Sequence, residues 1–366
     1  MAELTIKGLG KRFDDGSRAL AGLDATIRDG EFFVVLGPSG CGKSTLLRLI
    51  AGLETATEGS IACDGTPWSG PGVHLRAEDR RVGFVFQSYA LWPHMTVAEN
   101  VAFPAEAAGL KRPEREALAA RCLETVGLTP HAARRPAELS GGQRQRVALA
   151  RALASDARLV LMDEPLANLD PHLRAAMEEE FLRVHRVGGA TTLYITHDQR
   201  EAMGLADRIA VMMDGRFAQV AAPDDLYWRP ASVAVARFVG RGALLPATRR
   251  GGLARLEGLG EVPLREGAPD GRPVPEGPCG LFVRPEEVSL GAPGPGFAPA
   301  RVLRATYRGG LRELTLETPE GLTLEAIATG PVAAGETLGV ALRSGWALPA
   351  PELAALAPAA RDRVEA

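Results

Sequence analysis

An eight-residue stretch near the start of the chain has the residue types of a phosphate-binding loop. It reads Gly37-Pro38-Ser39-Gly40-Cys41-Gly42-Lys43-Ser44, follows an apolar segment and opens a helical one, which is the setting that this pattern requires. Glycines let backbone N–H groups curl around phosphate oxygens, and the start of the next helix adds partial positive charge. We expect ATP to bind along the loop and Thr45, with Lys43 on the β- and γ-phosphates and the Ser44 hydroxyl on Mg²⁺.

Two adjacent carboxylates offer the rest of the chemistry that ATP hydrolysis needs. The apolar segment Leu159-Val160-Leu161-Met162 ends in Asp163-Glu164. Asp163 fits a second Mg²⁺ ligand, and Glu164, one residue further on, is placed to polarise a water molecule as a general base. A strand that ends in two acidic residues is common in proteins, so this prediction depends on the phosphate loop.

A third motif, Leu139-Ser140-Gly141-Gly142-Gln143, predicts a second helix end that can bind an anion. Ser140 is a helix N-cap residue, and Gln143 stands at the capping-box position. The two glycines leave the first turn without side chains that would block an anion. A capped surface helix is the simpler interpretation of the Ser and Gln spacing alone. The intact five-residue motif, shortly before the two carboxylates, favours the anion site.

The elements that must position these residues alternate between strands and helices, as in an α/β domain with a largely parallel sheet. Strand-like runs are Glu31 to Leu36, Arg158 to Met162 and Thr191 to Thr196, and helical runs include Lys43 to Leu53 and Pro171 to Val187. Residues 97–136 break the alternation and read as a helical insert. We expect this nucleotide-binding domain to cover residues 1–239.

The remaining residues, 240–366, have a different texture and predict a small β-rich domain. Short strand-like segments alternate with turns rich in proline and glycine. Leu314 and Leu316 alternate with polar neighbours, Pro319-Glu320-Gly321 follows, and Leu322 and Leu324 alternate again. This pattern predicts a β-hairpin within a small barrel or sandwich.

Composition excludes some classes of function. The net charge of −3 gives no case for a nucleic-acid partner, which usually appears as a basic face. No apolar run reaches the roughly 18 residues that a membrane-spanning helix needs. The first residues, MAELTIKGLGKRF, carry charges within their apolar stretch and do not resemble a secretory signal. We therefore expect a cytoplasmic location.

The motifs together resemble the ABC ATPase family, and the resemblance covers essentially the whole chain. After the phosphate loop and before the Leu139–Gln143 motif comes Gln87 in Val85-Phe86-Gln87-Ser88-Tyr89, and after the two carboxylates come Asp170 and then His197 in Ile195-Thr196-His197-Asp198. The resemblance implies that Gln87 senses Mg²⁺ and the attacking water, that His197 contacts the γ-phosphate and that Phe13 stacks on adenine. Ordinary packing is the alternative for Phe13, because no local motif identifies it.

The resemblance also implies partners. It predicts a head-to-tail homodimer in which Ser140 and Gly142 of one chain, with Gln143, cap the ATP held by the other. The helical insert and Tyr89 to Met95 look like the surface that receives a transmembrane permease subunit. Ala167 departs from the family, which often has Ser there. Because Cys41 lies within the phosphate loop, a maleimide adduct on it is expected to inhibit hydrolysis, and ATP to protect.

The C-terminal residues resemble those of importer ATPases with a transport-associated OB-type domain. The stretch from Thr196 through Asp198 and Glu201, which also reads as a capping box, and the later Phe282-Val283-Arg284-Pro285-Glu286 carry this likeness. Such a subunit works at the cytoplasmic face of the inner membrane, with permeases and an external solute-binding protein. Residues 89–96 are similar to subunits that serve ferric iron, polyamines or phosphonates. An exporter ATPase and a soluble ABC protein outside transport are the alternatives.

Overall fold

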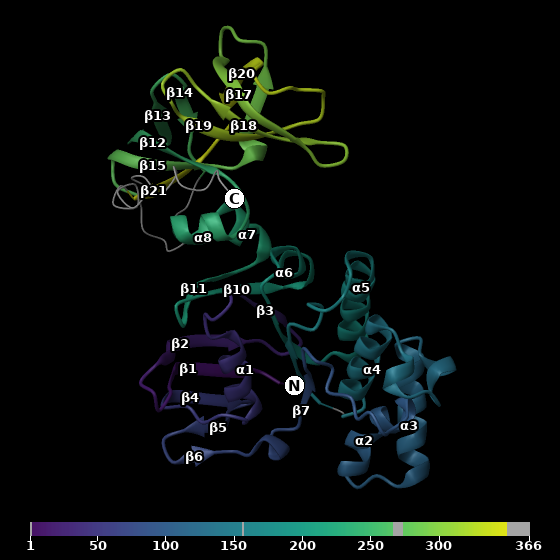
Figure 1. Cartoon of the computed structure of the whole chain (residues 1–366). Coiled ribbons are helices and arrows are strands. Elements are labelled where there is room, and N and C mark those ends of the chain that lie inside the picture. Colours follow the sequence, from purple (N-terminus) through teal and green to yellow (C-terminus); the bar gives the residue numbers. More distant parts are fainter. Residues whose placement is uncertain (1, 156, 266–273, 350–366) are drawn as a thin grey trace. The chain divides into compact units, whose positions relative to one another are not determined.

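The computed structural model describes residues 2–155, 157–265 and 274–349, and the chain divides into two compact units, residues 1–223 and 224–366. The predicted class is confirmed: the first unit is mixed α/β and the second is β-rich (Figure 1). None of the described helices is both long enough and apolar enough to cross a membrane.

A six-stranded sheet lies at the centre of the first unit. Its order is β11-β10-β3-β9-β8-β7, parallel throughout except for the β10–β11 pair. The strands β3, β8 and β9 are buried along nearly their whole length, as strands covered on both faces must be. The strand bounds are β3 Phe32–Leu36, β7 Val82–Val85, β8 Leu159–Asp163, β9 Thr191–Thr196, β10 Arg208–Met213 and β11 Arg216–Ala221.

A second, antiparallel sheet in the same unit is a feature that the sequence patterns did not predict. Its order is β2-β1-β4-β5-β6. Its strands mix buried and exposed residues and contain several register shifts, so they lack the continuous apolar runs by which the parallel strands were found. The bounds are β1 Leu4–Arg12, β2 Arg18–Ile27, β4 Glu58–Cys63, β5 Thr66–Gly70 and β6 Val73–His74.

The helix that follows the phosphate loop packs into the main core of this unit. Leu46, Leu47, Leu49 and Ile50 of α1 are buried with apolar residues of both sheets. Among the described residues of the unit outside the insert, the helices are α1 Lys43–Ala51, α4 Gly141–Leu153, α5 Pro171–Gly188 and α6 Gln199–Leu205, with one short 3₁₀ turn at Ala77–Asp79. Because α1 packs against apolar residues of both sheets, the position of the loop at its N-terminus is fixed.

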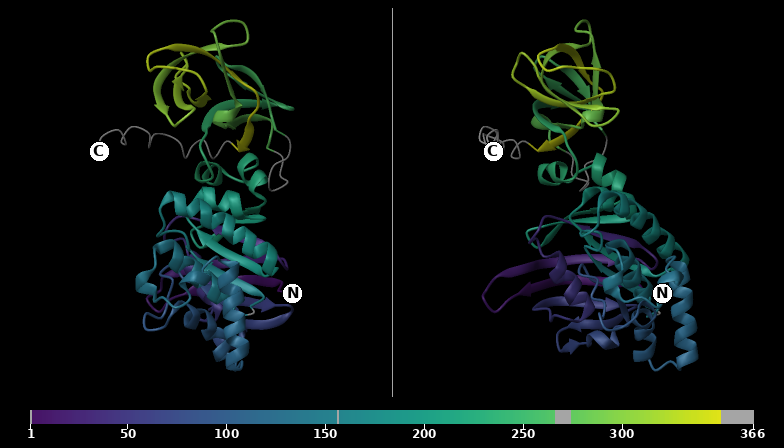
Figure 2. Two further views of the ribbon diagram at one scale, coloured as in Figure 1. Left: turned by 90° about the vertical axis from the view of Figure 1, so that its right-hand side faces the viewer. Right: turned by 45° about the vertical axis from the view of Figure 1, so that its right-hand side comes forward.

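The helical insert is present as predicted. Residues 97–136 form α2 Val97–Ala107, α3 Arg112–Thr125 and the 3₁₀ turns η2 Thr129–His131 and η3 Pro136–Glu138, with no strand between them among these described residues. The helices α2 and α3 lie side by side, as both views in Figure 2 and Figure 1 show. A capping box between Thr96 and Glu99 starts α2.

The second unit contains two five-stranded antiparallel sheets, ordered β14-β13-β12-β15-β21 and β16-β20-β17-β18-β19. The predicted hairpin is β18–β19, in which Leu316 pairs with Leu324 and Leu314 with Ala326. The strand bounds are β12 Ala243–Arg250, β13 Leu253–Leu256, β14 Gly260–Pro263, β15 Gly277–Val283, β16 Val288–Gly291, β17 Ala298–Tyr307, β18 Arg312–Glu317, β19 Thr323–Ala328, β20 Thr337–Leu342 and β21 Trp346–Pro349, with a 3₁₀ turn at Pro285–Glu287.

Two short helices belong to the second unit, whereas the sequence pattern placed them in the first. These are α7 Pro223–Trp228 and α8 Val233–Phe238. Val233 and Ala236 of α8 are buried against Phe282 and Trp346 of the β-rich unit. A short helix is stabilised mainly by burying its apolar face, and its own sequence does not show which unit that face packs against. Residues 350–366 of the predicted tail domain lie outside the described residues.

Candidate functional site

The phosphate loop connects the end of β3 to the start of α1, and its glycines are sterically required. Gly42 has a φ of 108°, and a Cβ on it would lie 2.5 Å from the backbone oxygen of Ala19. A Cβ on Gly37 would lie 2.4 Å from the backbone oxygen of Met212. Both contacts are shorter than atoms tolerate, so the loop can follow this path only with glycine at these positions.

Lys43 is buried at the start of α1, with an exposed fraction of 4%. Its Nζ donates hydrogen bonds to the backbone oxygens of Gly37 and Pro38, at 2.9 and 3.0 Å. It lies 3.9 Å from Oε1 of Glu164. The ammonium group therefore sits inside the curl of the loop, where an anion bound by the loop would meet it.

Ser44 and Asp163 meet although they are far apart in the sequence. The Ser44 hydroxyl donates to Oδ1 of Asp163 at 3.2 Å, which joins the start of α1 to the end of β8. Burial raises the pKa of the Asp163 carboxyl above its usual value, and the Ser44 hydrogen bond partly opposes this. A hydroxyl and a half-buried carboxylate fit Mg²⁺, which takes few protein oxygens and completes its shell with phosphates and water.

Glu164 follows β8 in a strained conformation and faces His197. Its φ is 42°, in the left-handed region that side chains other than glycine rarely adopt. Its N–H donates to the backbone oxygen of Ile195 at 3.0 Å, and its Oε2 lies 3.0 Å from Nδ1 of His197. This conformation places the carboxylate beside the histidine at the end of the neighbouring strand β9, and the surrounding contacts must offset its strain.

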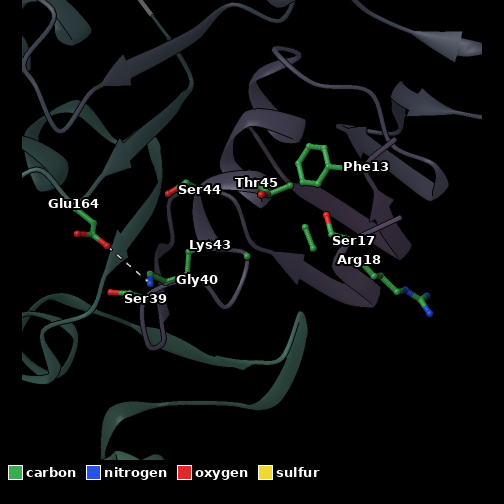
Figure 3. A pocket seen from close by; sticks show the side chains of 11 residues that line it. Phe13, Ser17, Arg18, Ser39, Gly40, Lys43, Ser44, Thr45 and Glu164 are labelled. Atoms are coloured by element: carbon green, nitrogen blue, oxygen red, sulfur yellow. Dashed lines mark ion pairs between the residues drawn. The ribbon is translucent and has the colours of Figure 1, made fainter. Parts of the chain in front are cut away.

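A cavity of about 430 Å³ runs along the loop. In Figure 3 Glu164 lies on one side of Lys43 and Phe13 on the other. Phe13 has an exposed fraction of 38%, and Nζ of Lys11 lies 5.1 Å from the centre of its ring. The described residues that line the cavity are Phe13, Ser17, Arg18, Ala19, Ser39, Gly40, Gly42, Lys43, Ser44, Thr45 and Glu164. An exposed aromatic ring at one end and a cationic loop at the other suit a nucleotide.

The side chain of Cys41 does not face this cavity, contrary to the expectation from its place in the loop. It is buried to 7% exposure within the core of the first unit, and burial raises the pKa of its thiol. Cys41 is not among the described residues that line the cavity, and its N–H donates to the backbone oxygen of Pro38 at 3.4 Å. Gly37 and Pro38 likewise contribute backbone, through the carbonyls that hold Lys43, and are not part of the described cavity lining.

Gln87 follows β7, and its side chain is exposed. Its backbone oxygen accepts a hydrogen bond from Nδ2 of Asn168 at 2.9 Å. The next residues are constrained: Tyr89 and Ala90 have φ values of 65° and 46°. The buried guanidinium of Arg151 in α4 donates to the backbone oxygens of both. The structure brings Gln87 near the loop after Glu164 but outside the described cavity lining.

The Leu139–Gln143 motif forms the predicted capping box at the start of α4. The Ser140 hydroxyl accepts from the Gln143 N–H at 3.3 Å, and Gln143 Oε1 accepts from the Ser140 N–H at 2.9 Å. Ser140 is exposed, and neither it nor Gly142 belongs to the described lining of the chain's own cavity. The side-chain Nε2 of Gln143 also lies 3.2 Å from Nε2 of His131. This helix start is therefore open to a ligand held by another molecule.

The structure adds site residues that the sequence patterns missed and changes one role. Ser17 and Arg18 line the cavity beside Phe13 from the first hairpin, and no local motif distinguishes them. Asp198 caps α6 as predicted, but the expected return bond from Glu201 is wrong. Glu201 is buried and accepts from Tyr194 Oη and Thr196 Oγ1 instead, at 2.8 and 2.7 Å.

Comparison with protein families agrees with the geometry of both units. A family model for "ABC transporter" matches residues 20–167, which include the phosphate loop, the Leu139–Gln143 motif and the two carboxylates. A model for the TOBE domain matches residues 281–348. The matched ranges fall within the first and second compact units.

Curated relatives extend the similarity over nearly the whole chain. The sn-glycerol-3-phosphate import ATP-binding protein UgpC of Burkholderia thailandensis is 41% identical over 358 residues, covering 93% of this chain and 95% of that protein. UgpC 1 of Rhizobium johnstonii is 49% identical over 244 residues, 67% of this chain and 65% of that protein. These relatives are named for sn-glycerol-3-phosphate, not for the ferric iron, polyamine or phosphonate suggested by residues 89–96.

A solved structure of an ATP-binding cassette dimer in a post-hydrolysis state, bound to ADP and Pi, shares the fold of the first unit. It has a TM-score of 0.55 and 33% sequence identity, and it covers 60% of this chain and 98% of that chain. The family motifs, the full-length relatives and this cassette point to one class. The chain belongs to the ABC transporter family, as the ATP-hydrolysing, ATP-binding subunit of an importer with a C-terminal TOBE domain.

Proposed function

We propose that this chain hydrolyses MgATP at a site made from two copies of itself and thereby drives a permease that imports a small polar solute. The observation that carries the proposal is the position of Glu164, 3.9 Å from Lys43 and 3.0 Å from His197 at the end of the phosphate-loop cavity. A base, a cation and a histidine around one point are the groups that attack on a γ-phosphate requires.

Each side chain has a role that follows from its place. Lys43 binds the β- and γ-phosphates, and the loop N–H groups bind the remaining oxygens. Glu164 orients and deprotonates the attacking water. His197, beside Glu164, contacts the γ-phosphate, and Phe13 stacks on adenine. Ser44, Asp163 and Gln87 would hold Mg²⁺, which would neutralise charge on the phosphates.

A homodimer completes the site. Ser140, Gly142 and Gln143 lie at a helix start that their own chain's cavity does not use. Such a start attracts anions through its free N–H groups and helix dipole. In a two-fold head-to-tail arrangement this start caps the ATP held by the other copy, and two equal sites result. The dimeric cassette structure bound to ADP and Pi supports this arrangement.

A groove of about 420 Å³ between β7, α2 and α4 is the proposed seat of a permease helix. Its aromatic lining includes Phe84 stacked on Phe86 and Trp92 tilted against Phe103, with centroids 4.0 and 4.2 Å apart. The buried side chain of Asn100 bonds to Trp92, Met95 and Thr96 backbone groups and so fixes the rim. An apolar floor with an ordered rim suits an amphipathic helix.

The remaining partners follow from the importer class. The subunit works at the cytoplasmic face of the membrane, while permeases and an external solute-binding protein select the solute. The curated relatives make sn-glycerol-3-phosphate the first solute to test. Exporter and non-transport ABC proteins share the nucleotide motifs, and the TOBE match and the importer relatives favour import over both.

Phosphate release from purified chain tests the proposed chemistry. Wild type is expected to release phosphate from ATP only with Mg²⁺, and Lys43→Ala is expected to bind little ATP. A second experiment tests the transport role: the Glu164→Gln chain is purified from host membranes in the presence of ATP, and the proteins that co-purify with it are identified. Recovery of a permease pair supports it. Recovery of an export permease, ribosomes or DNA-repair proteins contradicts it.

A further inference from the structure

Arg174, near the start of α5, makes contacts that the sequence motifs do not explain. Its Nη2 donates to the backbone oxygen of Leu169 at 3.3 Å, and its Nη1 donates to Oδ2 of Asp198 at 3.0 Å. Leu169 lies in the loop that follows Glu164, and Asp198 directly follows His197. One guanidinium therefore joins the segment after the base to the segment after the histidine.

Asp198 and Glu201 complete the acidic side of this junction. Oδ1 of Asp198 caps α6 by accepting from the N–H groups of Arg200 and Glu201, which leaves Oδ2 for Arg174. Glu201 Oε1 lies 3.7 Å from Nε of Arg174. Its exposed fraction is only 3%. Because the carboxylate is buried and the guanidinium is half-buried, solvent screens their attraction less than that of a surface ion pair.

These bonds close a ring of contacts around the reacting groups. From Glu164 the chain runs through a turn, in which the Ala167 N–H donates to the Glu164 oxygen at 3.2 Å, to Leu169. Arg174 carries the path to Asp198, and the adjacent His197 returns to Glu164 at 3.0 Å. Both ends of the Glu164–His197 contact are thus tied to one side chain. Its strained φ of 42° makes Glu164 dependent on such support.

We propose that Arg174 is a positioning residue that holds the loop after Glu164 in register with His197 and so sets the rate of hydrolysis. The inference rests on the proposed function of Glu164 and His197. Arg174 does not line the described part of the nucleotide cavity, so it acts through kcat and not through ATP affinity. The planar fork of arginine reaches the carbonyl and the carboxylate together, which the single ammonium of lysine does not.

The test compares steady-state ATPase kinetics of Arg174→Gln, Arg174→Lys, Asp198→Asn and the Gln/Asn double variant. Asn also caps helices, so Asp198→Asn removes the charge and keeps the cap. We expect kcat to fall about 10-fold to 100-fold in Arg174→Gln and Asp198→Asn, as small misplacements of reacting groups do. The KM for ATP is expected to stay within about 3-fold of the wild-type value. We expect the kcat of Arg174→Lys to lie between those of wild type and Arg174→Gln. The kcat of the double variant is expected to fall no further than that of the worse single variant.

Arg186→Gln, an exposed arginine on the same helix, is the matched control and should behave as wild type. Wild-type kcat in both single variants would overturn the proposal. Additive losses in the double variant would also overturn it, because they indicate that the two residues act independently. A rise in KM that accompanies a lower Tm would do the same, because it indicates a structural role. If Arg174→Gln fails to fold, Arg174→Lys and Asp198→Asn decide. Wild-type protein without turnover would instead refute the proposed function itself.

Discussion

At the scale of single residues, strain and burial decide what the nucleotide site can do. Glu164 is held at a φ of 42° with its carboxylate against His197, whereas the neighbouring Asp163 is tied to Ser44. Two adjacent carboxylates therefore have different partners. This separation is what the assignment of one to metal and the other to water requires.

Replacing Glu164 by Gln should abolish turnover while leaving ATP binding intact. The change keeps the volume of the side chain and removes the base, so kcat is expected to fall by about 100-fold to 10,000-fold. Phosphate release and binding of a fluorescent ATP analogue measure the two effects. Glu179→Gln, at an exposed position on α5, is the control. Turnover near the wild-type rate in Glu164→Gln would show that another group activates water.

The buried thiol of Cys41 should resist alkylation in the folded protein. Burial raises its pKa, so at neutral pH less of the reactive thiolate forms, and the core covers the sulfur. We expect maleimide to label Cys41 slowly, to label it faster as pH rises toward the raised pKa or in denaturant, and to leave ATPase activity unchanged under native conditions. Mass spectrometry of the loop peptide gives the labelling rate. Fast labelling that ATP prevents would show that the thiol faces the nucleotide after all.

At the scale of elements, the loops are held by contacts with neighbouring strands and helices. Gly42→Ala should distort the phosphate loop, because a Cβ there meets the Ala19 oxygen at 2.5 Å in addition to the unfavourable φ. The free energy of unfolding is expected to fall by about 1–3 kcal/mol. Gly65→Ala is the control, since Gly65 also has a positive φ, 75°, but open space around it. Urea denaturation compares them, and equal losses would show that the contact with Ala19 contributes nothing.

Arg151 should be required for order in the loop after Gln87. Its guanidinium satisfies the backbone oxygens of Tyr89 and Ala90 and lies 5.0 Å from the ring of Trp92. Arg151→Met leaves two carbonyls unpaired, with an expected loss of about 1–3 kcal/mol. Hydrogen exchange over residues 88–95 should accelerate, while Arg121→Met at an exposed position changes nothing. Unchanged exchange would indicate that the loop holds its shape without Arg151.

At the scale of the whole molecule, the proposed function depends on two chains. The Glu164→Gln protein should be a monomer without nucleotide and a dimer with MgATP, because ATP supplies the anion that both helix starts need. Adding Gly142→Asp should prevent this dimer by placing a carboxylate opposite the γ-phosphate. A Cβ on Gly142 would meet only the Leu173 side chain, at 3.5 Å, so the backbone leaves room for a side chain, and Tm shows whether the variant folds. Gly204→Asp is the control, and light scattering measures the mass. A dimer that survives Gly142→Asp would contradict the composite site.

Motifs that are continuous in the chain could be predicted from the sequence alone. The phosphate loop, the Leu139–Gln143 capping box and the β18–β19 hairpin each depend on local hydrogen bonds and turn geometry. Short-range physics determines such features, so residue type and spacing are enough to find them. The same applies to the parallel strands β3, β8 and β9, whose burial requires continuous apolar runs.

Contacts between distant segments were decided only by the tertiary structure. Ser44 meets Asp163 across 119 positions, and Arg174 joins the loop after Glu164 to the segment after His197. The burial of Cys41, the role of Glu201 and the placement of α8 in the second unit belong to the same class. No local sequence pattern identifies these contacts, because a side chain's neighbours depend on how helices and sheets pack. The sequence by itself determined the chemistry available to this protein, and the packing decided which groups meet.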